Sequence, residues 1–248
     1  MLTTLVLILA GLAAGALNAV AGGGTFLTFP ALVWAGVPPV MANATATLAA
    51  LPGYVGSAWG YRHDLRAQGP LGLRSIVALA VLGGLAGAGL LLVTSSETFS
   101  AIVPWLLMLA TAAFAAGPIL LRHITARGRA VGAGLAALMV LAVTIYGGYF
   151  NGGLGIMLLA VFGLIGFADL NAANGLKNAV SAILSVVSVA TYIVAGLIDW
   201  THALPLALSC AAGGYVGAAL ARRITRPALL RGFITLVGAA MTIAFFAL

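Results

Sequence analysis

Eight stretches of this chain are long and apolar enough to cross a membrane as helices. Together they make up most of the chain. A membrane-spanning helix needs about 20 mostly apolar residues. The stretches are residues 2–21, 42–60, 73–93, 99–121, 130–150, 171–196, 201–221 and 228–248. We therefore predict an all-α polytopic membrane protein.

Charged residues are too rare for a soluble protein of this length. The 248 residues include eleven Lys or Arg and four Asp or Glu, so that 6% of the chain is charged. Average soluble domains carry roughly 25% charged residues. This scarcity excludes soluble enzymes and nucleic-acid binders, and the hydrophobic content of 63% excludes a disordered chain.

The sequence shows no pattern typical of catalysis, cofactor binding or metal binding. Cys210 is the one cysteine, and the three histidines are scattered, so we expect no metal site. We find no Gly-rich phosphate loop and no catalytic pair, and we expect neither a cofactor nor enzymatic activity. The first twenty residues lack a basic segment, so we interpret them as a membrane helix and not as a cleaved signal.

Two shorter apolar segments, 25–34 and 155–167, each follow a glycine cluster. At about 1.5 Å per residue, each is long enough for half to two-thirds of a crossing as a helix. The glycines before them interrupt the preceding stretches, so both segments are predicted to be halves of broken helices. The sequence leaves open whether they cross the membrane or are re-entrant.

The chain contains three pairs of similar segments at an offset of 130 or 131 residues. The pairs are residues 20–25 with 150–155, Asn43 with Asn174, and 83–88 with 213–218. Because order and spacing agree, we predict two repeats, residues 1–125 and 126–248. The small-xxx-small spacing of Gly83, Gly87, Gly213 and Gly217 predicts close helix packing.

The basic loops predict the orientation of the chain. Cytoplasmic loops of membrane proteins are enriched in Lys and Arg, and loops 61–74, 122–129 and 222–231 hold ten of the eleven cations. All three lie on the cytoplasmic side if segment 155–167 counts as a crossing. Each repeat then has five segments, and the repeats are inverted. The alternative is a pair of re-entrant loops in parallel repeats.

The glycine clusters are candidate substrate contacts. A helix that starts after such a break directs unpaired N–H groups and a partial positive charge at whatever lies there. Two breaks in corresponding positions would direct two such ends at one site, which suits a small anion. Asn151 stands at the second break and is expected to cap the short helix that follows.

Lys177 is the one lysine in the chain and the one cation outside the basic loops. It lies about six residues, or about 9 Å, into its apolar stretch. An ionisable group inside a membrane is costly and by default indicates a functional site. Asn174, Asn178 and Ser181 share its helical face, so we interpret Lys177 as an anion ligand. The alternative is a snorkelling lysine paired with Asp169.

The motifs around the two breaks resemble those of a known family. In the first half they are NAVAGGGTFLTFP (18–30), GVPPVMANAT (36–45) and YRHDLR (61–66). In the second half they are NGGLG (151–155), NAANGLKN (171–178) and GLIDW (196–200). Together they make nearly the whole chain similar to the sulfite exporter TauE/SafE family of membrane permeases.

The resemblance implies a permease for sulfite or small organosulfonate anions. It also implies which residues of this chain contact the substrate. These are Asn18, Gly22, Gly23, Gly24, Thr25, Asn43, Thr45, Asn151, Gly152, Gly153, Asn174, Lys177 and Asn178. The second break lacks a hydroxyl that matches Thr25, so whether both breaks contact the substrate equally is left open.

We therefore predict a multi-pass transporter of the cytoplasmic (inner) membrane that moves small anions by alternating access. Its expected partners are the substrate and the lipid bilayer, with no nucleic acid, and a homodimer is left open. The competing hypotheses are an anion channel with the same lining, a non-transporting membrane scaffold and a membrane enzyme. Substrate, direction and coupling ion do not follow from the sequence.

Overall fold

The computed structural model describes residues 2–20, 23–125, 131–221 and 227–246. Within these ranges the chain forms ten α-helices and no strand, which confirms the predicted all-α fold. The helices are α1 (Leu2–Val20), α2 (Thr25–Trp34), α3 (Pro39–Gly60), α4 (Leu73–Val93), α5 (Ser96–Thr125), α6 (Ala133–Tyr149), α7 (Leu154–Leu164), α8 (Leu170–Val194), α9 (Trp200–Ala221) and α10 (Pro227–Phe246).

The two short helices α2 and α7 are bounded by glycines. The N-cap residues are Gly24 for α2 and Gly153 for α7. Beyond their C-terminal ends the backbone takes a positive φ, 88° at Gly36 and 102° at Gly166. Residues with a side chain rarely adopt this conformation, so the glycines determine where both helices end.

Several helices are suited to a membrane by length and composition. Among the described residues, Leu73–Val93, Ser96–Ala113 and Ala172–Val194 are long and apolar enough to cross one. Shorter apolar helices are Leu2–Asn18, Thr25–Trp34, Ala133–Tyr149, Leu154–Leu164 and Thr235–Phe246. Trp34, Trp59 and Trp200 are exposed near helix ends, where tryptophan commonly lies at the membrane surface.

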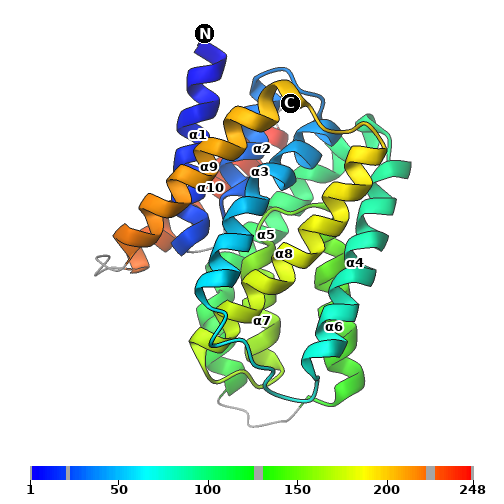
Figure 1. Ribbon diagram of the computed structural model, residues 1–248, viewed down its shortest axis with the longest axis vertical. Coiled ribbons are helices and arrows are strands. Elements are labelled where there is room, and N and C mark those ends of the chain that lie inside the picture. Colours follow the sequence, from blue (N-terminus) through cyan, green and yellow to red (C-terminus); the bar gives the residue numbers. More distant parts are fainter. Residues whose placement is uncertain (1, 21–22, 126–130, 222–226, 247–248) are drawn as a thin grey trace.

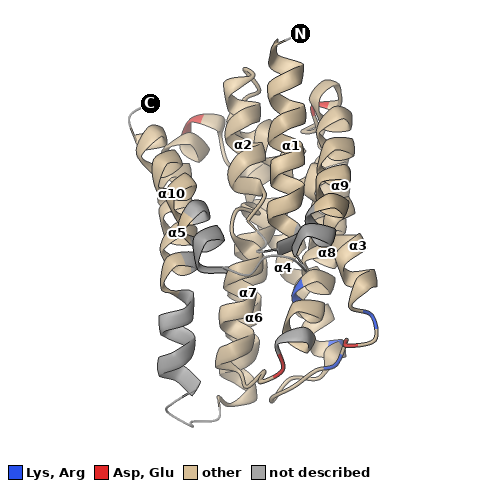
Figure 2. Ribbon diagram, turned by 90° about the vertical axis from the view of Figure 1, so that its left-hand side faces the viewer, with Lys and Arg blue, Asp and Glu red and all other residues tan. Residues whose placement is uncertain are grey.

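The short helices form two hairpins at opposite ends of the molecule. Figures 1 and 2 share one vertical axis, and in both α1 and α2 lie in the upper half and α6 and α7 in the lower half. In each hairpin the chain turns back at a glycine break. The turns therefore fall in the interior, away from the two ends.

Most helix pairs keep a counterpart when α1–α5 are exchanged for α6–α10. Helix α1 packs on α9 as α4 packs on α6, and α3 contacts α9 as α8 contacts α4. Helix α2 contacts α3 as α7 contacts α8. The exchange converts the pair α3 and α8 into itself, and likewise the pair α5 and α10. Helices α3 and α8 therefore meet at the centre of this pattern.

Close glycine contacts join the outer helix pairs. A Cβ atom at Gly83 or Gly87 of α4 would collide with Thr144 or Ile145 of α6. A Cβ atom at Gly213 of α9 would collide with the backbone of α1 at Leu12. These contacts confirm the close packing predicted for the three glycines, whereas the surroundings of Gly217 lie outside what the structure describes.

The described arginines gather at one end, whereas acidic residues lie at both ends. Figure 2 shows Lys and Arg in the lower half, where α3 ends, and Asp and Glu at the upper end and the lower end alike. The predicted loop 61–74 corresponds to this lower cluster. Residues 126–130 and 222–226 of the other two basic loops lie outside the described ranges.

Candidate functional site

The second break packs against α5 and meets one side chain of α2. Gly153 has a φ of 74° and lies in the left-handed region. A Cβ atom at Gly153 would lie 2.8 Å from Ala110 Cβ and 3.3 Å from the ring of Phe26. Phe26 is in the first turn of α2, so its ring connects the second break to the start of α2. That both helix ends face one site stays a prediction.

Side chains cover the carbonyl groups at this break. Asn43 Nδ2 donates to the carbonyl oxygen of Tyr149 over 2.8 Å, and the Tyr146 hydroxyl donates to that of Gly152 over 2.7 Å. The Tyr192 hydroxyl donates to the carbonyl oxygen of Gly148. The negative ends of these peptide dipoles are therefore neutralised by donors from α3, α6 and α8.

Several amide groups at the same break are not covered. Within the described chain, the N–H groups of Gly152, Gly153 and Gly155 have no hydrogen-bond acceptor, and all three residues are buried. Buried amide groups are normally paired. With the carbonyl groups of Gly148, Tyr149 and Gly152 covered and these amides free, the break favours an anion.

Asn151 connects the second break to both central helices. Its Oδ1 accepts a hydrogen bond from the Tyr54 hydroxyl of α3 over 2.9 Å, and its Nδ2 donates to Ser185 Oγ of α8 over 3.2 Å. The expectation that its side chain caps α7 is wrong, because the N-cap is Gly153 without a side-chain bond. The backbone oxygen of Asn151 accepts from Leu154 N instead.

The first break is partly closed by its own helix. Asn18 Oδ1 accepts a hydrogen bond from the N–H of Gly24 over 2.9 Å, so this amide is not available to a ligand. Gly23 and Gly24 are buried, and Gly22 lies outside the described residues. Asn18 is therefore a local cap of the break.

The two predicted threonines have different surroundings. Thr25 is buried, and its side chain lies beside the Tyr54 hydroxyl, close to the contact between Tyr54 and Asn151. Thr45 Oγ1 accepts a hydrogen bond from the N–H of Asp199 over 3.0 Å. Thr45 thus holds the loop between α8 and α9 and is not directed at the second break.

Lys177 is buried with 4% of its surface exposed. Its Nζ donates to Asn174 Oδ1 over 3.3 Å. All four acidic residues are described, and none forms an ion pair with Lys177. The alternative partner, Asp169, is paired with Arg66 from the loop after α3.

A buried polar face extends along α8 from Lys177 to the second break. Lys177, Ser181 and Ser185 are spaced by one helical turn each and are all buried. Asn178 is also buried, with 5% exposed, while Asn174 is half-buried. Ser185 contacts Asn151, so this face joins the lysine to the break.

Sequence reasoning missed the tyrosines and Ser185. Tyr54, Tyr146 and Tyr192 are distributed over three apolar helices, where a tyrosine is easily taken for a packing residue. The signal that could have found them is the hydroxyl itself, because a buried tyrosine normally directs its O–H to a partner. Here all three hydroxyls bind atoms of the second break or the residues just before it.

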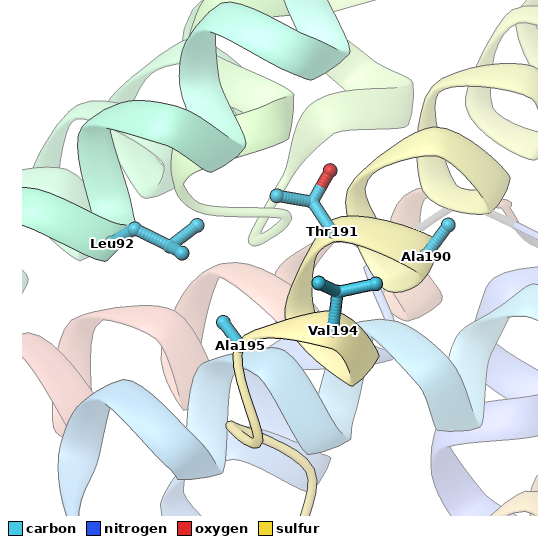
Figure 3. A pocket seen from close by; sticks show the side chains of 5 residues that line it. All are labelled: Leu92, Ala190, Thr191, Val194 and Ala195. Carbon is cyan, nitrogen blue, oxygen red and sulfur yellow. The ribbon is translucent and has the colours of Figure 1, made fainter.

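A separate recess lies on the surface, between the C-terminal ends of α4 and α8. It has a volume of about 420 Å³ and is lined by Leu92, Ala190, Thr191, Val194 and Ala195 (Figure 3). Its hydroxyl, on Thr191, donates to the carbonyl oxygen of Val187. The lining carries no charge and is unsuited to an anion. No cluster of three His, Cys, Asp or Glu exists among the described residues.

These features define a polytopic helical membrane protein with a polar interior built around a broken helix. The family model for the sulfite exporter TauE/SafE matches residues 7–245, and the chain belongs to this family. This confirms the family to which the motifs pointed.

One curated relative is a Sinorhizobium protein described as "Probable membrane transporter protein ORF9". It is 35% identical over 106 residues, a match that covers 41% of this chain and 39% of the relative. The family and this relative support a membrane transporter, although the match spans less than half the length of the curated relative.

Proposed function

We propose that this transporter is a secondary carrier of small anions, with sulfite and organosulfonates as its substrate class, and that Lys177 binds the anion. The observation that carries the proposal is the burial of Lys177 without an acidic partner. Burial of an uncompensated charge costs several kcal/mol. A bound anion offsets this cost. A lysine that served only in packing would leave the cost without compensation.

The second break supplies the remaining contacts in the proposed site. The free amides of Gly152, Gly153 and Gly155 are donors suited to oxyanion oxygens. The hydroxyl of Ser181, which has no partner in the described chain, stands one turn from Lys177 towards Ser185. The family model adds the substrate class, since it describes sulfite exporters.

Alternating access in this proposal depends on two inverted repeats, residues 1–125 and 126–248. The exchange pattern of the helix packing and the hairpins at opposite ends support this division. Broken helices in inverted repeats are a recurring design of secondary transporters. In this proposal the basic lower end faces the cytoplasm and the protein lies in the cytoplasmic membrane.

Flux measurements in proteoliposomes test the proposal. We expect saturable uptake of radiolabelled sulfite, counterflow against internal sulfite, and a loss of about tenfold or more in Lys177→Met, since one charge contact is removed. Arg62→Gln is the control, because Arg62 is an exposed cation. Flux without counterflow or saturation would favour a channel, and unchanged flux in Lys177→Met would refute the site.

A further inference from the structure

Four buried side-chain atoms have no hydrogen-bond partner in the described part of the chain: Thr28 Oγ1, Asn43 Oδ1, Thr111 Oγ1 and Ser181 Oγ. Three are hydroxyl oxygens, which can rotate to donate to a backbone carbonyl one turn back. Asn43 Oδ1 can only accept. It therefore needs a donor that the described protein does not provide.

The orientation of the Asn43 amide is fixed by its other end. Nδ2 donates to the carbonyl oxygen of Tyr149 over 2.8 Å. Rotation of the amide by 180° would place Oδ1 against this carbonyl, with two acceptors facing each other. Asn43 is fully buried, with 0% of its surface exposed. Bulk solvent therefore does not supply the donor that Oδ1 lacks in the folded chain.

The second break therefore offers many donors and one fixed acceptor. Its unused donors are the N–H groups of Gly152, Gly153 and Gly155. Three nearby carbonyl groups, those of Gly148, Tyr149 and Gly152, are already covered by side-chain donors. Tyr149, the partner of Asn43, lies only three positions before Gly152. A ligand that satisfies this set carries several acceptor oxygens and one hydrogen-bond donor.

We propose that Asn43 selects anions that carry an O–H or N–H group, and that this group donates to Asn43 Oδ1. The shared chemistry is a monoanion with a donor, either a protonated oxyanion such as hydrogen sulfite or a sulfonate with a hydroxyl or amino group. The inference rests on the proposed function, because it assigns a specificity residue to the same site.

A pair of inhibitors of equal shape tests the proposal in wild-type protein. We expect 2-hydroxyethanesulfonate to inhibit uptake of radiolabelled sulfite about tenfold more strongly than propane-1-sulfonate, which has a methyl group in place of the hydroxyl. A second arm compares unlabelled sulfite at two pH values, with methanesulfonate correcting for pH effects on the protein. Better inhibition by the protonated form identifies the oxyanion as the source of the donor.

Variants assign the preference to Asn43. Asn43→Leu is expected to remove the preference for the donor, whereas Thr47→Val is expected to keep it. Thr47 lies one turn further along α3, and its hydroxyl donates to the backbone oxygen of Asn43. If Asn43→Leu does not fold, the two wild-type comparisons still decide.

Equal inhibition in both arms, with sulfite uptake still dependent on Lys177, overturns the role of Asn43 and leaves the proposed function intact. Persistence of the preference in a folded Asn43→Leu protein also overturns it. Absence of flux for every anion instead refutes the proposed function.

Discussion

The hydroxyl of Tyr54 donates a hydrogen bond to Asn151 Oδ1 over 2.9 Å, and both residues are buried. This bond joins α3 of the first half to the break before α7 in the second half. Asn151 continues the connection to Ser185 of α8. A change in the relative position of the two halves must therefore stretch or break this chain of hydrogen bonds.

Replacement of Tyr54 by Phe is expected to lower both stability and flux. The substitution leaves Asn151 Oδ1 buried without its donor, which costs about 1–3 kcal/mol. The melting temperature in detergent and the uptake of sulfite in proteoliposomes measure the two effects. Tyr215→Phe is a suitable control because Tyr215 is 83% exposed. Identical melting of the two variants would contradict a structural role for this bond.

Gly153→Ala is expected to be more damaging than Gly196→Ala. Both glycines have a positive φ, 74° and 70°, so each substitution brings a similar backbone cost of about 1–2 kcal/mol. A Cβ atom at Gly153 also presses on Ala110 and Phe26, whereas one at Gly196 meets nothing within 4 Å. The difference in melting temperature isolates the packing of the break. Equal losses would show that the break is not tightly packed against Ala110 and Phe26.

Cysteine labelling is expected to place the lower end in the cytoplasm. In a Cys210→Ser background, which removes the one native cysteine, His63→Cys lies in the basic loop after α3 and Ser96→Cys begins α5 at the other end. A membrane-impermeant reagent added to intact cells should label only Ser96→Cys. Labelling of His63→Cys alone would reverse the orientation.

Asp199 is expected to stabilise the fold at neutral pH and not in acid. Partial burial raises the pKa of its carboxyl, but hydrogen bonds from the side chain and backbone of His202 and from Thr201 N outweigh this, and the pKa lies below its ordinary value. Such an acid stabilises the folded state above its unfolded-state pKa of about 3.9. The contribution disappears as the pH falls through the lowered folded-state pKa.

Melting curves of Asp199→Asn between neutral pH and about pH 3 test this expectation. Asn retains the capping geometry, so the variant removes mainly the charge. Its melting temperature should lie below that of the wild type at neutral pH and approach it in acid. Asp64→Asn is the control, because the Asp64 carboxyl forms no ion pair in the described chain, and it should show no such convergence.

The helices could be predicted from the sequence because an apolar stretch in lipid has one way to pair its backbone. The short segment 25–34 was placed at its observed bounds, and 155–167 differs from α7 by a few residues. The α1–α2 and α6–α7 hairpins could not be predicted, since hydropathy does not tell a full crossing from a helix that turns back. That distinction arises from packing against α3, α5 and α8.

The candidate site was only partly predictable. Charge in an apolar stretch identified Lys177, and glycine clusters identified both breaks. The use of each amide depends on the folded backbone, so the sequence could not show that Asn18 covers Gly24, six residues on, or that Thr45 binds Asp199, which is distant in sequence. The substrate contacts of the named residues, and the two repeats, stay predictions.

The solitary position of Lys177 has a consequence for the transport cycle. The offset of 131 residues that aligns Asn43 with Asn174 places Ala46 at the position equivalent to Lys177. In the proposed mechanism the two halves exchange conformations when the site opens to the other side, so the ammonium group has a different setting in each state. The inward-open and outward-open forms then bind the anion with unequal dissociation constants. The asymmetry leaves the equilibrium distribution of an uncoupled substrate unchanged, but the bound anion then shifts the carrier towards the form that binds it more tightly.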